Sequence, residues 1–245
     1  MAKDPSVALI EAARELALRA DELVFSPPVA YVYNPLQYAR LAHEAYLARY
    51  GRDTKRTVFV GMNPGPWGMA QTGVPFGEVA SVRDWMKIEC SVQQPARQHP
   101  ARPVKGFDCP RREVSGRRLW GLAQDRFGDA AAFFAENFVA NYCPLMFLQN
   151  SGRNLTPDKL RVMDRRLLFE VCDRHLRRVI DTLIPEWVIG VGRFTQSRIR
   201  AVSESCGHRQ FSTGGILHPS PANPQANRNW AVKVTDHLVA LGVWT

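Results

Sequence analysis

Apolar residues recur every three or four positions in several stretches of the chain, which is the spacing of an amphipathic helix. The pattern predicts helices over residues 6–23, 35–51, 82–90, 117–128 and 158–183, a short helix from Phe194 and a final one from Asn229. In the longest, the predicted apolar stripe is Leu160, Met163, Leu167 and Val171, widened by Leu168, Cys172, Leu176 and Val179. Two predicted starts, Asn34-Pro35 and Thr156-Pro157, pair a capping side chain with a proline suited to the first helical position.

Four short apolar runs alternate with these helices and predict buried strands. They are residues 56–63 (RTVFVGMN), 137–143 (NFVANYC), 187–192 (WVIGVG) and 215–220 (GILHPS). Short strands separated by helices indicate an α/β domain with a mostly parallel sheet. Neither an internal repeat nor a low-complexity linker divides the chain, so residues 1–245 are predicted to form a single domain.

Polar side chains lie at or near the ends of these predicted strands. Asn63 ends the first, Asn141 lies in the second, and His218 lies in the fourth. Parallel α/β sheets bind ligands beyond the carboxyl ends of their strands, so these three side chains are expected to converge. The third strand runs into Gly192-Arg193, a helix start suited to a phosphate. Asparagine is also a common turn former and His218 could simply hydrogen-bond within its loop, so the convergence alone names no reaction.

The charge of the chain narrows the class of partner. Lysine and arginine number 32 against 23 acidic residues, which gives a net charge of +9. The excess is concentrated between Arg97 and Arg118 and again from residue 152 along the long helix. A basic footprint of this kind suits a polyphosphate such as DNA, although a solvated basic face without a partner is the alternative.

Several classes of protein are excluded by what the sequence lacks. The cysteines are odd in number and scattered, with no CxxC pair, so neither a disulfide framework nor a metal site is expected; they are Cys90, Cys109, Cys143, Cys172 and Cys206. The N-terminus is a charged amphipathic pattern without a signal peptide, and no run is apolar enough to span a membrane. A cytoplasmic protein is therefore expected, nucleoid-associated if bacterial. Phosphate-loop, GxSxG and HExxH motifs are missing from the sequence. The loops after Asn63 and His218 contain no catalytic-looking carboxylate, and Glu78 lies just after the first of these loops.

Two long segments resemble a known family. GMNPGPWGMAQTGVPFGEV (61–79) and HPSPANPQANRNW (218–230) are similar to the two motifs of the single-strand-selective monofunctional uracil-DNA glycosylases, within the uracil-DNA glycosylase superfamily, and NFVANYCPL is similar to the intervening segment. The resemblance runs from about residue 31 to 230 and indicates a bacterial-type member. It implies a three-layer α/β/α sandwich around a four-stranded, mostly parallel sheet. It also implies a hydrolase of N-glycosyl bonds that needs no cofactor or metal, removes uracil and C5-modified uracils such as 5-hydroxymethyluracil from DNA, and leaves an abasic site without lyase activity.

The resemblance assigns roles to single residues. Asn63 matches the asparagine that positions the attacking water, and His218 the histidine that stabilises the departing base. Asn141 matches the asparagine that pairs with the uracil edge, and Phe76 the aromatic ring that stacks on the flipped base. Gly65 stands where the classical uracil-DNA glycosylases carry a bulky tyrosine, which leaves room at the C5 edge for water or a hydroxymethyl group. Two further base-binding residues are expected, Met62 and Met69.

DNA contacts are expected from the second motif and from nearby arginines. The predicted wedge that enters the duplex consists of Pro219, Ser220, Pro221, Ala222, Asn223, Pro224, Gln225 and Asn227. Ala222 is small where many basic members carry a longer side chain, and its effect on strand preference is open. Phosphate contacts are expected from Arg153, Arg193 and Arg228. The role of Trp67 is open.

Alternatives to the expected activity differ in class. A non-catalytic sensor of damaged or single-stranded DNA would use the same charge and the same aromatic residue. A second alternative is a glycosylase that also accepts the deaminated purines xanthine and hypoxanthine, with the same chemistry on a different base. A third is a hydrolase of small nucleosides, which would need no wedge loop. The expected partner is uracil-containing DNA, single- and double-stranded, bound by a monomer. The sequence leaves open the preferred base and the preference between single and double strands.

Overall fold

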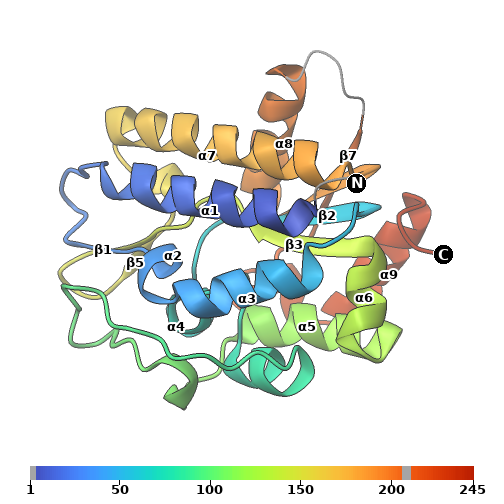
Figure 1. The fold of residues 1–245 in the computed structure, drawn as a ribbon, viewed down its shortest axis with the longest axis horizontal. Coiled ribbons are helices and arrows are strands. Elements are labelled where there is room, and N and C mark those ends of the chain that lie inside the picture. Colours follow the sequence, from blue (N-terminus) through green and yellow to red (C-terminus); the bar gives the residue numbers. More distant parts are fainter. Residues whose placement is uncertain (1–3, 206–210) are drawn as a thin grey trace.

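A parallel sheet of four strands forms the centre of the computed structural model, which describes residues 4–205 and 211–245 (Figure 1). Its strand order is β3-β2-β6-β7, with β2 at Thr57–Gly61, β3 at Asn137–Asn141, β6 at Trp187–Val191 and β7 at Ser212–Ile216. Every residue of β2 is buried, as expected of a central strand covered on both faces. Cys206, one of the five cysteines, lies outside the described residues.

Helices cover both faces of this sheet. One layer contains α1 (Pro5–Asp21), α3 (Arg40–Tyr50), α7 (Val162–Leu183) and α8 (Arg193–Ser205), and the other contains α5 (Val114–Phe127) and α9 (Trp230–Ala240) (Figure 1). A short helix, α6 (Ala130–Glu136), joins α5 to β3 and was not predicted. The three-layer α/β/α architecture is thereby confirmed. In the described residues no helix is both long and apolar enough to cross a membrane.

A second, smaller sheet was also not predicted; two of its strands come after β3 in the chain and one comes before the central sheet. It is antiparallel, in the order β1-β4-β5, with β1 at Tyr31–Tyr33, β4 at Met146–Leu148 and β5 at Asn154–Leu155. Strands of two or three residues are too short to show a period in the sequence. Two short helices lie nearby, α2 (Pro35–Tyr38) and α4 (Met69–Thr72). The predicted helix over 35–51 is therefore interrupted at Ala39, although its start is confirmed, because the Asn34 side chain caps it.

The predicted core face of α7 was one position out of register. Met163 and Leu167 are 60% and 43% exposed, whereas the residues predicted to widen the stripe are buried: Leu168, Cys172, Leu176 and Val179. The sequence offers two adjacent apolar stripes. The second is buried in the main core together with the sheet residues, whereas Val171 of the first packs against the small cluster that contains Leu16 and Ala17 of α1. The helix also begins at Val162, after a 3-10 turn at Pro157–Lys159, and not at residue 158.

The fourth strand lies earlier in the chain than predicted. Ser212 to Ile216 pair in parallel with β6, so His218 stands two residues beyond the strand and not within it. The adjacent glycines Gly214 and Gly215 have little strand propensity, which hid this edge strand. Close packing explains the glycine at position 215, because a Cβ there would lie 2.8 Å from the side-chain amide carbon of Gln196 in α8.

Candidate active site

A cavity of about 380 Å³ opens at the carboxyl ends of β2 and β3. Three of its lining residues are the polar side chains expected to converge, Asn63, Asn141 and His218. The loop after β2 contributes further walls, including Phe76 and Gly65. A volume of this order accommodates a small organic ligand such as a nucleoside.

The ring of Phe76 is positioned by an unusual backbone conformation that hydrogen bonds stabilise. Its φ of 52° lies in the left-handed region, which costs an L-residue with a bulky side chain roughly 1 kcal/mol or more. The Phe76 carbonyl compensates by accepting two hydrogen bonds, from the Trp120 indole N–H at 3.0 Å and from the Glu78 N–H at 2.8 Å. The Phe76 and His218 rings lie 6.3 Å apart between centroids. The ring is therefore a fixed wall beside the imidazole.

Asn141 reaches the cavity because Gly61, its register partner in β2, has no side chain. A Cβ on Gly61 would collide with Asn141 Oδ1 and would lie 2.5 Å from Cε2 of Phe76. The Asn141 Nδ2 donates to the Met69 Sδ at 3.0 Å, and a thioether is a weak acceptor. Met69 thus orients the amide from outside the cavity wall, whereas Met62 lines the cavity itself. The amide is positioned yet free to exchange that weak contact for a ligand.

Asn63 presents its amide oxygen to the cavity. Its Nδ2 donates to the Leu145 carbonyl at 3.2 Å, which fixes the orientation of the amide. The side-chain carbonyl is then the group available to accept a hydrogen bond from a ligand or a water.

His218 is prepared as a neutral hydrogen-bond donor. Burial lowers its pKa below the ordinary value of 6.5, so the imidazole is uncharged at neutral pH. The Ser220 N–H donates to Nδ1 at 3.1 Å, which makes Nδ1 the acceptor and leaves the proton on Nε2. The turn at Gly192, with φ of 96°, packs on the other side, where a Cβ would lie 3.3 Å from that of His218. The site therefore holds one tautomer with an N–H to donate.

A carboxyl group that the sequence did not point to also lines this cavity. This residue is Glu113, which stands immediately before α5. Its carboxyl lies against Gly65, because a Cβ added to Gly65 would collide with Glu113 Oε1. Burial raises the pKa of Glu113 to about 7, the nearby Gly116 N–H opposes this, and the charge of Glu78 adds to it. No spacing in the sequence placed Glu113 near Asn63.

Comparison with known proteins gives the family. The model of the Uracil DNA glycosylase superfamily matches residues 48–239. A "Single-strand selective monofunctional uracil-DNA glycosylase" of Rattus norvegicus is 46% identical over 231 residues, 94% of this chain and 83% of the relative. The Mus musculus relative of the same description is 45% identical over 231 residues, 94% of this chain and 82% of its own length. This chain belongs to the single-strand-selective monofunctional branch of the uracil-DNA glycosylase superfamily. The crystal structure of SMUG2 from Pedobacter heparinus shares the fold, with a TM-score of 0.66 at 17% identity over 95% of this chain and 97% of that one.

In this family member the loop predicted as a wedge is held at its base by Arg118 of α5. One guanidinium nitrogen donates to the Pro219 carbonyl at 2.9 Å and the other to Asn227 Oδ1 at 3.2 Å. The Asn227 amide in turn donates to the Pro221 carbonyl at 3.0 Å. These bonds fix both ends of the loop, and Ala222 stays exposed between them. Nothing in the sequence had singled out Arg118 for this position.

The predicted phosphate-binding arginines lie on separate segments around the site. Arg193, at the start of α8, lines a groove of about 490 Å³ together with His218, Pro224 and Gln225. Arg228 is exposed just beyond the 3-10 turn at Pro224–Asn227. Arg153 is exposed beside Asn154, which lines the cavity. The structure thus places Arg193 in a groove with His218, leaves Arg153 exposed next to a cavity residue, and leaves Arg228 exposed after the loop predicted as a wedge.

Trp67, whose role the sequence left open, joins the first loop to the basic segment before α5. The guanidinium carbons of Arg102 and Arg111 lie 5.4 and 4.7 Å from the centre of its ring. Cation–π contacts of this length are attractive. The indole therefore helps to place the arginine-rich residues 91–113 beside the loop that follows β2.

Proposed function

We propose that this chain is a monofunctional DNA glycosylase that hydrolyses the glycosidic bond of uracil and of C5-modified uracils in DNA, leaving an abasic site for base excision repair. One observation carries the proposal: two asparagine amides, a neutral imidazole and an aromatic wall meet in one cavity of nucleoside size. The printed descriptions of the relatives, single-strand-selective monofunctional uracil-DNA glycosylases, support it. The chemistry of each group is consistent with the reaction.

Recognition of the base would rest on Phe76 and Asn141. The glycosidic bond of a stacked nucleotide is inaccessible, so the nucleotide must be extruded and its base received by a stacking surface. Uracil presents a donor at N3 and an acceptor at O4, which one amide group satisfies with its oxygen and its nitrogen. Cytosine presents the reverse pattern at these positions. Unmatched buried pairs cost about 1–3 kcal/mol each, so Asn141 would reject cytosine.

Bond breaking would rest on His218 and Asn63. Cleavage of the bond between C1′ and N1 leaves the electron pair on the base, and the resulting anion has much of its charge at O2. The Nε2–H of His218 would stabilise that charge as it develops. The amide oxygen of Asn63 would orient the water whose oxygen bonds to C1′, with the released proton passing to solvent. A cationic sugar reacts readily with water, so a strong base is not needed.

The absence of a lyase step has a structural explanation. Strand cleavage by a glycosylase needs an amine nucleophile at C1′. Among the described residues none of those that line the cavity is a lysine. The enzyme would therefore stop at the abasic site.

We further propose that residues 1–245 act as one domain and as a monomer, in the cytoplasm, on single- and double-stranded DNA. The net charge of +9 and the exposed Arg153 and Arg228 support contact with the DNA backbone. Light scattering with and without DNA measures the oligomeric state, and a dimer would refute this part of the proposal. Matched single- and double-stranded oligonucleotides measure the strand preference.

The decisive assay uses an end-labelled oligonucleotide with one uracil. We expect it to become alkali-labile after incubation and to stay intact without alkali. Asn63→Ala and His218→Ala are each expected to lose about 100-fold or more in rate, with an unchanged circular dichroism spectrum. His237→Ala is the matched control, because His237 is exposed on α9 and is not among the residues that line the cavity.

Two outcomes would contradict the proposal. Retained binding without release of free uracil under any salt concentration would favour the damage sensor, and full activity of either cavity variant would refute the role of that side chain. A panel that contains xanthine and hypoxanthine decides whether deaminated purines are accepted. Rapid cleavage of free deoxyuridine would favour a nucleoside hydrolase.

A further inference from the structure

We propose that the carboxyl group of Glu113 reads the C5 substituent of the extruded pyrimidine, admitting a hydroxymethyl group and rejecting a methyl group. The inference rests on the proposed function, because it assumes that a pyrimidine enters the cavity. It concerns a residue outside the two motifs that carry the resemblance, and it assigns to that residue the choice between an oxidised base and thymine.

The position of the carboxyl is defined by two glycines of the first loop. A Cβ on Gly65 would collide with Glu113 Oε1, and one on Gly68 would collide with Oε2 and lie 2.5 Å from the carboxyl carbon. The volume that Gly65 leaves free is therefore occupied in part by a polar group and not by empty space. A glycine here does more than widen the site, because it admits the carboxyl of another segment.

The Gly116 N–H lies near enough to this carboxyl to lower its pKa, but the carboxyl is not fully satisfied within the described part of the protein. Glu113 stands at the N-cap of α5, yet its side chain makes no capping hydrogen bond. Its Oε2 is buried and has no hydrogen-bond partner among the described residues. This oxygen lies against Gly68 and the helix start at Gly116, whereas Oε1 lies toward Gly65 of the cavity wall and is the oxygen that can accept a hydrogen bond from a ligand.

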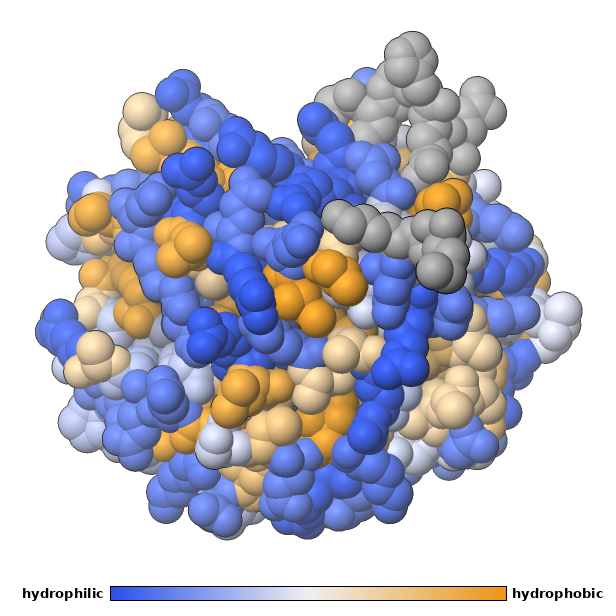
Figure 2. Space-filling view, viewed as in Figure 1, coloured by the Kyte–Doolittle hydropathy of each residue, from blue (hydrophilic) through white to orange (hydrophobic). Residues whose placement is uncertain are grey.

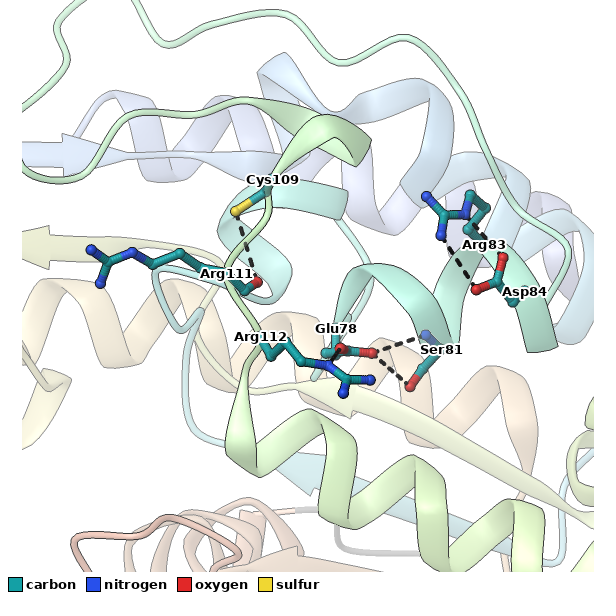
Figure 3. Close-up of polar contacts among 7 residues, drawn as sticks. All are labelled: Glu78, Ser81, Arg83, Asp84, Cys109, Arg111 and Arg112. Carbon is teal, nitrogen blue, oxygen red and sulfur yellow. Dashed lines mark hydrogen bonds and ion pairs between the residues drawn. The ribbon is translucent and has the colours of Figure 1, made fainter.

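The segment that carries Glu113 is anchored on both sides. Figure 3 shows Arg112 directed toward Glu78, with its Nε 3.1 Å from Oε1, while the other Glu78 oxygen accepts from Ser81. On the helical side, Gly116 packs so closely that a Cβ would collide with the Phe76 carbonyl. The carboxyl is thus fixed relative to the aromatic wall on which the base would stack.

The edge of the base that faces Glu113 follows by elimination. If Asn141 reads N3–H and O4 and His218 approaches O2, these two residues cover the ring from C2 to C4. N1 carries the sugar, near Asn63. The remaining edge, C5 and C6, then faces the remaining wall, which Gly65 and Glu113 form.

The chemistry of the carboxyl suits one substituent and not the other. With a pKa raised by burial to about 7, Glu113 offers at least one accepting oxygen in either protonation state. The hydroxyl of a C5 hydroxymethyl group can donate to that oxygen. A methyl group cannot, and it would displace any water that solvates the carboxyl. Sites built to hydrogen-bond a substrate group strongly reject analogues that lack it.

The experiment compares kcat/KM for uracil, 5-hydroxymethyluracil and thymine in otherwise identical single-stranded oligonucleotides. For Glu113→Leu we expect the ratio of 5-hydroxymethyluracil to uracil to fall about tenfold, and thymine release to become detectable. Glu113→Gln keeps both volume and hydrogen bonding and should stay within about threefold of the wild-type ratio. Glu136→Gln is the matched control, because Glu136 is exposed at the end of α6, at the opposite end of β3 from the cavity, and its neutralisation should leave the ratio unchanged.

The results separate the two proposals. If the wild-type protein releases no uracil, the proposed function fails. If it releases uracil and Glu113→Leu keeps the wild-type ratio, the inference about Glu113 is overturned and the proposed function stands. A Glu113→Leu variant that loses all substrates equally also overturns it, because that pattern indicates a purely structural role. Should Glu113→Leu not fold, the Glu113→Ala variant gives the same comparison of ratios.

Discussion

Replacing Glu113 by glutamine tests the buried carboxyl without any DNA. A carboxyl whose pKa is raised in the folded state binds its proton more tightly there than in the unfolded chain. Its contribution to stability is therefore fully present below the unfolded pKa and is lost as the pH rises through the folded pKa. For Glu113 that window runs from 4.5 to about 7. Glutamine does not titrate, so the variant should lack this loss.

The magnitude follows from the size of the shift. Each pKa unit corresponds to about 1.4 kcal/mol, so the rise from 4.5 to about 7 amounts to about 3 kcal/mol at full ionisation. Part of this is already lost at pH 5, and the residue as a whole is only partly buried, which screens the charge. Between pH 5 and pH 8 the wild-type protein should lose about 2 kcal/mol of unfolding free energy relative to Glu113→Gln.

The assay is urea unfolding of both proteins at pH 5, 6, 7 and 8, followed by tryptophan fluorescence. The difference in unfolding free energy should change in favour of the variant as the pH rises. The Glu78 carboxylate raises the pKa of Glu113 and the Gly116 N–H lowers it, while Arg112 pairs with Glu78 and the neutral His218 lines the same cavity. A pH-independent difference, or one that favours the wild-type protein at high pH, would refute the buried, destabilised carboxyl.

Other predictions concern the walls of the cavity and the wedge. Gly61→Ala should reduce uracil release by about tenfold or more, because the added Cβ displaces Asn141 and Phe76; release kinetics near the wild-type rate would contradict this. Arg118→Ala frees the wedge loop and should slow excision from duplex DNA more than from single strands, whereas an equal loss on both would show that the loop needs no brace. Because burial lowers the pKa of His218, the pH profile for uracil should show no limb from its protonation at or above the ordinary histidine value. A limb there that His218→Ala removes would show that the imidazole is not buried as described.

The sequence by itself determined the class of fold and most of the central elements. Apolar runs such as TVFV and WVIG are typical of buried strands in a parallel sheet, so β2, β3 and β6 could be located from these short runs. The rule that ligands bind beyond strand ends placed Asn63, Asn141 and His218 together before any coordinates. Local signals succeeded here because the information lies within a few adjacent residues.

Tertiary packing decided the remainder. The core face of α7 depended on which of two apolar stripes joins the main core of the sheet. The edge strand β7 is stabilised by its pairing with β6, because its two adjacent glycines have little strand propensity. The carboxyl of Glu113 enters the cavity from a segment far from both motifs in sequence, through space that Gly65 and Gly68 leave free. No local pattern reports such a contact, because it depends on the close approach of two loops. The sequence thus named the groups that would carry out the chemistry, and the fold alone showed which further group stands beside them.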